Sequence, residues 1–141
     1  MAKQTLCNRL AKIVGGKGMM INGTCVVQRL RTNLRLSILG RRAKSPLVIP
    51  FALSFESRDS QGRTLNIGET VILEREINPF VTQLRKRRII VTAIHNHWLF
   101  QGSCFKYIHW EKVENPVVFA QQSTDAAKKV GFYKNVMKAR L

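Results

Sequence analysis

The sequence predicts one α+β domain, and three observations support that prediction. The chain has 141 residues and is 45% hydrophobic, which suits a single domain with a continuous core. Its second half has the pattern strand, helix, strand, strand, helix, the order of most of a ferredoxin-like split βαβ unit. The first half has an N-terminal helical pattern followed by short β-rich segments. We therefore expect one domain over residues 1–141, with a mixed or antiparallel sheet and a basic tail from about residue 131.

The first half is expected to hold one helix and several strands that extend the sheet. Residues 4–14 carry apolar positions at close to helical spacing, which predicts a helix. Residues 24–31 and 34–39 are β-rich and are separated by Thr32-Asn33, which predicts a hairpin between them. Residues 47–55 form a further candidate strand.

Two helix starts are predicted in the second half. Asn78-Pro79 and Asn115-Pro116 each place an N-cap residue before a proline in the first helical position. The first helix would follow a strand over residues 70–76 and end in the basic run 85–88, which complements the negative end of its dipole. The second would run toward Val130.

All three histidines fall on one predicted hairpin, with strands over residues 89–100 and 104–113. His95 and His97 are two residues apart, so they face the same side of a strand. A three-residue turn would place Tyr107 opposite His95 and bring His109 diagonally beside it on that same side. A two-residue turn would shift the pairing by one residue and send His109 to the other side. The hypothesis of one shared site depends on the first register.

Three converging imidazoles would form the ligand set of a catalytic zinc site, with one position open for water. The expected cofactor is thus a divalent transition metal, zinc first, bound by His95, His97 and His109. Without a metal, the same histidines could act as general acid and base, and either arrangement would allow a hydrolase. Glu74 and Glu76 are candidate partners that would fix a histidine tautomer, and Glu76 is included among the catalytic candidates. Tyr107 is a candidate hydrogen-bond donor to a ligand, although all of these residues could instead have purely structural roles.

The net charge of +16, from 24 Lys and Arg against 8 Asp and Glu, suggests a second kind of partner. Such an excess favours nucleic acid, anionic lipid or an acidic protein, although it could also serve only solubility. The binding would be sensitive to salt and blind to sequence. A non-enzymatic partner protein, including a homodimer formed through an exposed strand edge, is a further alternative. The candidate polyanion contacts are Arg29, Arg31, Arg35, Arg41, Arg42, Arg85, Arg87 and Arg88.

Cysteine usage and hydropathy bear on the compartment. Cys7, Cys25 and Cys104 are scattered, odd in number and without a C-x-x-C pair, so we expect free and mostly buried thiols. Neither a signal peptide nor an apolar run long enough to span a membrane is visible in the sequence. These observations predict a cytoplasmic protein in a reducing environment.

Three segments also carry a family resemblance. Residues 68–79 (GETVILEREINP), 91–97 (VTAIHNH) and 108–110 (IHW) resemble the LppY/LpqO-type bacterial domain of unknown function, over about residues 6–127. The most specific element is the T-A-x-H-N-H string followed by a histidine on the next strand. The resemblance implies a bacterial domain whose hallmark is this histidine hairpin, and it supplies no reaction. The name-giving members are lipoproteins, but no apolar segment precedes Cys7, so we expect no lipid anchor there.

Overall fold

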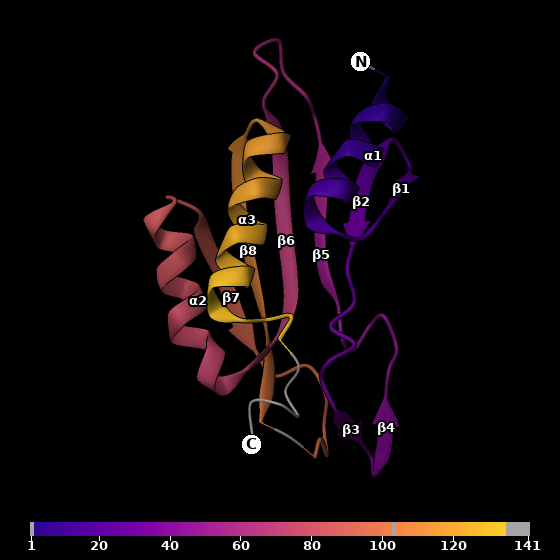
Figure 1. Ribbon diagram of the computed structural model, residues 1–141, viewed down its shortest axis with the longest axis vertical. Coiled ribbons are helices and arrows are strands. Elements are labelled where there is room, and N and C mark those ends of the chain that lie inside the picture. Colours follow the sequence, from indigo (N-terminus) through magenta and orange to yellow (C-terminus); the bar gives the residue numbers. More distant parts are fainter. Residues whose placement is uncertain (1, 103, 135–141) are drawn as a thin grey trace.

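The computed structural model describes residues 2–102 and 104–134, and within them it has the expected α+β architecture (Figure 1). A six-stranded sheet has the order β1-β2-β5-β6-β8-β7, and a separate two-stranded sheet pairs β3 with β4. All of these pairings are antiparallel. The elements are α1 (Lys3–Val14), β1 (Lys17–Ile21), β2 (Thr24–Gln28), β3 (Leu36–Ile38), β4 (Arg41–Ala43), β5 (Phe51–Glu56), β6 (Thr64–Leu73), α2 (Glu74–Lys86), β7 (Ile90–His95), β8 (Phe105–Glu114) and α3 (Pro116–Val130).

The expected ferredoxin-like half is confirmed. The chain runs β6-α2-β7-β8-α3. In the sheet, β8 lies between β6 and β7, so the two strands of the β6-α2-β7 unit are separated by β8, as in a split βαβ unit. On the other side of β6, strands β5, β2 and β1 extend the sheet to its far edge.

The three long helices cover one face of the large sheet, and the main core lies beneath them (Figure 1). Trp110 on β8 is fully buried there. Its ring centroid is 5.2 Å from that of Phe80 on α2, and its Nε1 donates to Ser123 Oγ on α3 at 3.0 Å. Gly68 on β6 is the register partner of Trp110, and a Cβ atom at Gly68 would lie 2.0 Å from the indole. The absence of a side chain at Gly68 therefore makes room for the largest residue of the core.

Among residues 2–102 and 104–134, a second core covers one end of the opposite face of the sheet. Val71 and Tyr107 are register partners whose side chains pack in a second core, beneath the segment that carries β3 and β4. Glu69 and His109 lie two residues farther along the same two strands, so they share this face. They occupy the sheet just beyond its covered end.

Two expectations about the elements are wrong. Residues 24–31 and 34–39 do not form a hairpin with each other; β2 pairs with β1 across Asn22-Gly23, and β3 pairs with β4 across Leu39-Gly40. All four turn residues have positive φ, which is the backbone of a type I′ hairpin turn and which Asn-Gly favours. The Asn22-Gly23 signal thus outweighs the weaker one at Thr32-Asn33.

Helix α2 begins at Glu74, which is earlier than Asn78-Pro79 predicts, and Pro79 lies inside the helix. The carboxylate of Glu76 accepts a hydrogen bond from Leu73 N at 2.9 Å and so satisfies a free amide at the helix start. The other start is confirmed, because Asn115 Oδ1 accepts from Val117 N and Val118 N. Most of the expected basic tail, residues 135–141, lies outside the described residues.

The expectation of free thiols is wrong for two of the three cysteines. Cys7 on α1 and Cys25 on β2 form a disulfide, with their Cα atoms 5.6 Å apart, while Cys104 is free and exposed. Helix α1 packs across β1 and β2, and this crossing brings the two cysteines together from positions 18 residues apart. Disulfides persist in oxidising compartments, so the cysteines no longer argue for a reducing one. None of the described helices is long and apolar enough to cross a membrane.

Candidate functional site

The two strands of the histidine hairpin pair in the register that places His95 and His109 on one face of the sheet. His95 pairs with Tyr107 and Ala93 pairs with His109, which confirms the first of the two predicted registers. The connection is longer than a three-residue turn, because β7 ends at His95 and β8 begins at Phe105. His95 and His109 therefore lie on regular strands, whereas His97 lies on the connecting segment.

His95 and His109 are in direct contact. Their Nε2 atoms are 2.9 Å apart, and their rings stack with centroids 4.9 Å apart and an interplanar angle of 18°. The other nitrogen of His95, Nδ1, is 3.0 Å from the carbonyl oxygen of Asn96. Because a carbonyl oxygen can only accept, Nδ1 of His95 is the donor in this contact, and in the neutral form of the ring Nε2 then carries the lone pair.

Glu69 on β6 faces the outer nitrogen of His109. The two residues are register partners, and Glu69 Oε2 lies 3.7 Å from His109 Nδ1. Burial lowers the pKa of His109, the Glu69 carboxylate opposes that shift, and the neighbouring His95 and His97 add to it. The net pKa lies below the ordinary value of 6.5, so His109 is mostly neutral at pH 7. Sequence reasoning did not single out Glu69, since only the pairing of two distant strands brings it to the histidine.

His97 lies beside this pair in an aromatic setting. Its ring centroid is 5.7 Å from that of His95, 5.1 Å from that of Tyr107 and 4.5 Å from that of Trp98. Tyr107 is the buried support of this group. Its hydroxyl donates to Val48 O and accepts from Trp98 Nε1 at 2.8 Å, and burial raises its pKa to about 12. Tyr107 therefore supports the wall of the site, and in this structure its hydroxyl proton is directed to Val48 O and not to a ligand position.

The site brings two of the three histidines into direct contact, and the third, His97, lies beside them without joining that contact. Within residues 2–102 and 104–134, no three His, Cys, Asp or Glu side chains lie close enough together to hold one metal ion. The expected three-histidine set is thus not assembled in this geometry. What the structure assembles is a histidine pair with a carboxylate on one side and a carbonyl oxygen on the other.

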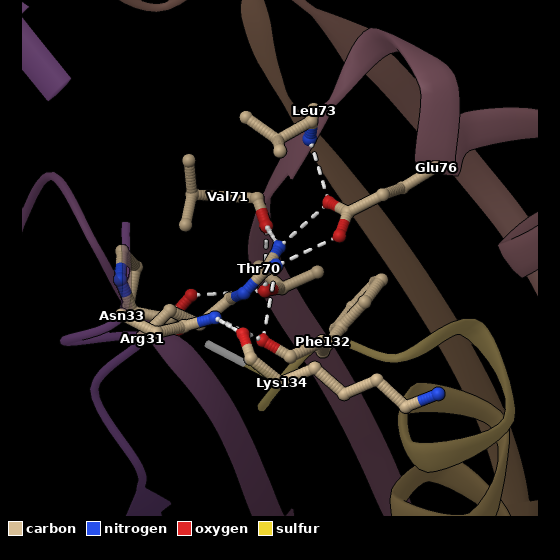
Figure 2. Close-up of polar contacts among 9 residues, drawn as sticks. Arg31, Asn33, Thr70, Val71, Leu73, Glu76, Phe132 and Lys134 are labelled. Atoms are coloured by element: carbon tan, nitrogen blue, oxygen red, sulfur yellow. Dashed lines mark hydrogen bonds and ion pairs between the residues drawn. The ribbon is translucent and has the colours of Figure 1, made fainter. Parts of the chain in front are cut away.

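Glu76 lies elsewhere, in a buried ion pair with Arg31 (Figure 2). The two Arg31 Nη atoms donate to the two Glu76 carboxylate oxygens at 2.9 and 2.8 Å, and they also donate to Val71 O and Phe132 O. Both side chains are almost fully buried. This pair joins the link after β2, the end of β6, the start of α2 and the segment after α3. Its contacts are those of a structural clamp, which gives Glu76 no contact with the histidines and removes Arg31 from any surface cluster.

Glu74 reaches the site only through two intermediates. Its Oε1 is 3.9 Å from Lys106 Nζ, and Lys106 donates to Asn96 Oδ1 at 2.9 Å. Asn96 in turn provides the carbonyl oxygen that accepts from His95. Glu74 therefore helps to position the segment after β7, which contains Asn96, and it has no direct contact with the imidazole of His95.

Several of the predicted polyanion contacts have internal roles. The Arg29 guanidinium lies 3.5 Å from the centre of the Tyr133 ring and its Nη1 donates to Val14 O. Arg85 donates to Ile89 O, and Arg87 donates to Gln83 O, so these two residues hold the end of α2. The exposed members of the predicted set are Arg35, Arg41, Arg42, Arg85 and Arg88.

Comparison with known proteins identifies a family to which the chain belongs. A family model described as a Domain of Unknown Function (DUF1259) matches residues 8–129, a range that includes the histidine pair, His97 and Glu69. Neither the curated proteins nor the solved structures give a match. Because the matched range covers most of its length, the chain belongs to the Domain of Unknown Function (DUF1259) family.

Proposed function

We propose that this domain binds a divalent transition metal ion, zinc foremost, between His95 and His109, and that the ion holds a small polar ligand. One observation carries the proposal. The Nε2 atoms of the two rings are 2.9 Å apart, while the Nδ1 atom of each ring faces an oxygen acceptor. Histidines that ligate metals have this arrangement, with the second ring nitrogen directed to a carboxylate or a backbone carbonyl.

The placement of protons explains why a cation suits this position. Asn96 O requires a proton on Nδ1 of His95, and the carboxylate of Glu69 favours a proton on Nδ1 of His109. Without a metal, the 2.9 Å hydrogen bond between the two Nε2 atoms needs a proton on one of them. With both Nδ1 atoms protonated, a cation would take the place of that proton and accept both Nε2 lone pairs.

The spacing is also close to what a metal needs. Tetrahedral zinc with imidazole nitrogens at about 2.0–2.1 Å keeps two such nitrogens about 3.3 Å apart. A separation of about 0.4 Å more than the present one would therefore admit the ion. His97, with its ring centroid 5.7 Å from that of His95, is the nearest candidate for a third ligand, and the remaining positions would be open to water or to a ligand oxygen.

A hydrolase is the reaction class that such a centre would serve. A metal with open positions lowers the pKa of bound water and polarises carbonyl or phosphoryl oxygens. Glu69 would act as a positioning residue, since it touches His109 and would fix the tautomer that coordinates. Within the family, we assign the chain to the LppY/LpqO type on the string from Thr92 to His97 and on His109.

The test is elemental analysis and zinc titration of protein purified without an affinity tag or a chelator. We expect about one zinc ion per chain, with binding lost in the His95→Ala and His109→Ala variants and weakened in His97→Ala. Asn96→Ala is the matched control, because its backbone carbonyl remains and only its side chain is lost. If wild-type protein binds zinc, cobalt and nickel no better than the His95→Ala/His109→Ala variant, the proposal is wrong. Acid–base catalysis by the histidines without a metal would then be the hypothesis to test.

We do not extend the proposal to nucleic acid. Of the eight arginines that the sequence suggests for a polyanion surface, Arg31 is buried in an ion pair, and Arg29, Arg85 and Arg87 donate to carbonyl oxygens of their own chain. Those contacts support the structural reading of the basic runs.

A further inference from the structure

One end of the molecule exposes large apolar side chains. Leu39 in the turn between β3 and β4 is 70% exposed, and Leu99 and Phe100 in the segment after β7 are 76% and 78% exposed. The turn and this segment both lie at the lower end of the molecule (Figure 1). We call these three residues, together with the two segments that carry them, the apolar tip.

Backbone hydrogen bonds join the two segments of the apolar tip. Leu39 N donates to Phe100 O at 3.0 Å, and Gly102 N donates to Ser37 O at 2.9 Å. Ile38 and Gln101 form an isolated antiparallel bridge between them. The three apolar side chains are therefore presented by one connected unit, and not by two independent loops.

The backbone of the apolar tip is unfavourable for the residues that it carries. Leu39 and Phe100 have φ values of 53° and 54°, a left-handed conformation in which glycine and asparagine are common and bulky residues are rare. Because both side chains are largely exposed, they gain little packing against the described residues that would offset this conformation. Their display to solvent thus calls for a partner that covers apolar atoms.

Cations flank the apolar tip. Arg41 and Arg42 on β4 and Lys44 directly after it are all exposed, and we call them the basic strand. No Asp or Glu precedes Glu56, and none lies between Glu76 and Glu111, so neither segment of this end carries a negative charge. The surface combines exposed apolar side chains with positive charge that no acidic residue of the same two segments offsets.

We propose that this end of the molecule docks on an anionic lipid bilayer. The apolar tip enters the boundary between headgroups and acyl chains, and the basic strand contacts lipid phosphates. The charges alone would also suit nucleic acid, but exposed leucine side chains contribute nothing to phosphate contacts, which dominate sequence-blind binding. The inference is independent of the metal site and does not use its residues.

The experiment is co-sedimentation of the full chain with vesicles of phosphatidylcholine alone and with about 30% phosphatidylglycerol. We expect the protein to bind the anionic vesicles and not the neutral ones. Leu39→Ser/Leu99→Ser/Phe100→Ser should lower vesicle affinity at least about tenfold, because three apolar side chains lose their contact with lipid. The matched control is Met19→Ser/Ile21→Ser on β1, whose side chains are 60% and 51% exposed at the far edge of the sheet, and it should bind as wild type does.

The charge arm compares two triple variants. Arg41→Gln/Arg42→Gln/Lys44→Gln should reduce binding and weaken its salt dependence, whereas Lys86→Gln/Arg88→Gln/Lys128→Gln removes the same charge elsewhere and should have little effect. Equal losses in the two variants would show attraction by net charge alone and would overturn the proposal. So would equal affinity for both vesicle types, or unchanged binding by the apolar-tip variant.

Depth gives a second readout. A Phe100→Trp variant should be quenched by brominated acyl chains in anionic vesicles, and the same substitution at Ile21 should not be. Failure of Phe100→Trp to be quenched while the protein is sedimented with the vesicles would contradict insertion. Thermal unfolding of each variant checks that these exposed substitutions leave the fold intact.

Discussion

Glu69 on β6 lies directly opposite His109 on β8, with its Oε2 atom 3.7 Å from the Nδ1 atom of the ring. The contact joins strands that are distant in the sequence and adjacent in the sheet. It gives the histidine pair a negative charge on the side away from His95.

Glu69→Gln should weaken zinc binding by about 10–100-fold, the usual effect of removing a partner of a ligating histidine. The amide is similar in shape but lacks the charge that favours a proton on Nδ1. Competition with a chromophoric chelator measures the change. Glu111→Gln removes the same charge two residues beyond His109 on β8 and should bind zinc as wild type does. Equal affinities for all three proteins would contradict a role for Glu69.

Glu76→Gln should reduce the free energy of unfolding by about 3–5 kcal/mol, because it leaves the Arg31 guanidinium buried without its counter-charge. The amide oxygen can still accept from Leu73 N, so the loss would report on the ion pair and not on the helix start. Denaturant titration measures the difference. Glu74→Gln, in the same helical turn but half exposed, should change stability by no more than about 0.5 kcal/mol.

Reduction of the Cys7–Cys25 disulfide should lower the free energy of unfolding by about 3 kcal/mol, given the 18-residue separation that it closes. Thermal unfolding with and without reductant tests this, and a Cys7→Ser/Cys25→Ser variant should be insensitive to the reductant. Thiol titration of native protein should find only Cys104, and reduction followed by unfolding should release all three thiols. Three reactive thiols in the native protein would contradict the disulfide.

Strong alkali should destabilise the fold through its two tyrosines. Burial raises the pKa of Tyr107 to about 12 and raises that of Tyr133 further above the ordinary value of 10. The unfolded chain therefore loses its phenolic protons first, so this contribution is complete below pH 10 and decreases as the pH rises above it. Ultraviolet titration should show tyrosine ionisation delayed in native protein relative to protein in denaturant. Coincident titration curves would contradict the burial of both hydroxyls.

Local sequence signals predicted the second half of the fold well and the first half less well. Asn115 caps α3 and Gly131 ends it in a left-handed conformation, both as their residue types predict. The His95–Tyr107 register is one of the two that spacing within the hairpin allowed, and the sequence did not choose between them. The start of α2 was not predicted, because Glu76 supplies the cap from within the helix and is held there by Arg31, a residue 45 positions away. The Cys7–Cys25 bond depends in the same way on how α1 crosses two strands.

The candidate site likewise contains features that local sequence signals indicate and features that depend on contacts between distant segments. The placement of His95 and His109 on one face follows from alternation along the strands once the hairpin register is known, and the sequence left two registers open. Glu69 requires the register between β6 and β8, which are separated by α2 and β7, and no local pattern encodes it. The contacts of Tyr107 and Glu76 could not be predicted for a related reason, since their hydrogen bonds go to Val48 and Arg31, which only the folded chain brings near.

The Arg31 guanidinium also bears on how the chain folds. Its acceptors lie 40, 45 and 101 residues farther along the sequence, at Val71, Glu76 and Phe132. During synthesis, Arg31 leaves the ribosome long before the last of these acceptors exists, and a buried guanidinium without them is strongly disfavoured. The early segments therefore cannot reach their final packing until the C-terminal helix has been made. Contacts this distant in sequence favour slow, all-or-none folding, in which the N-terminal and C-terminal segments reach their native packing in the same step.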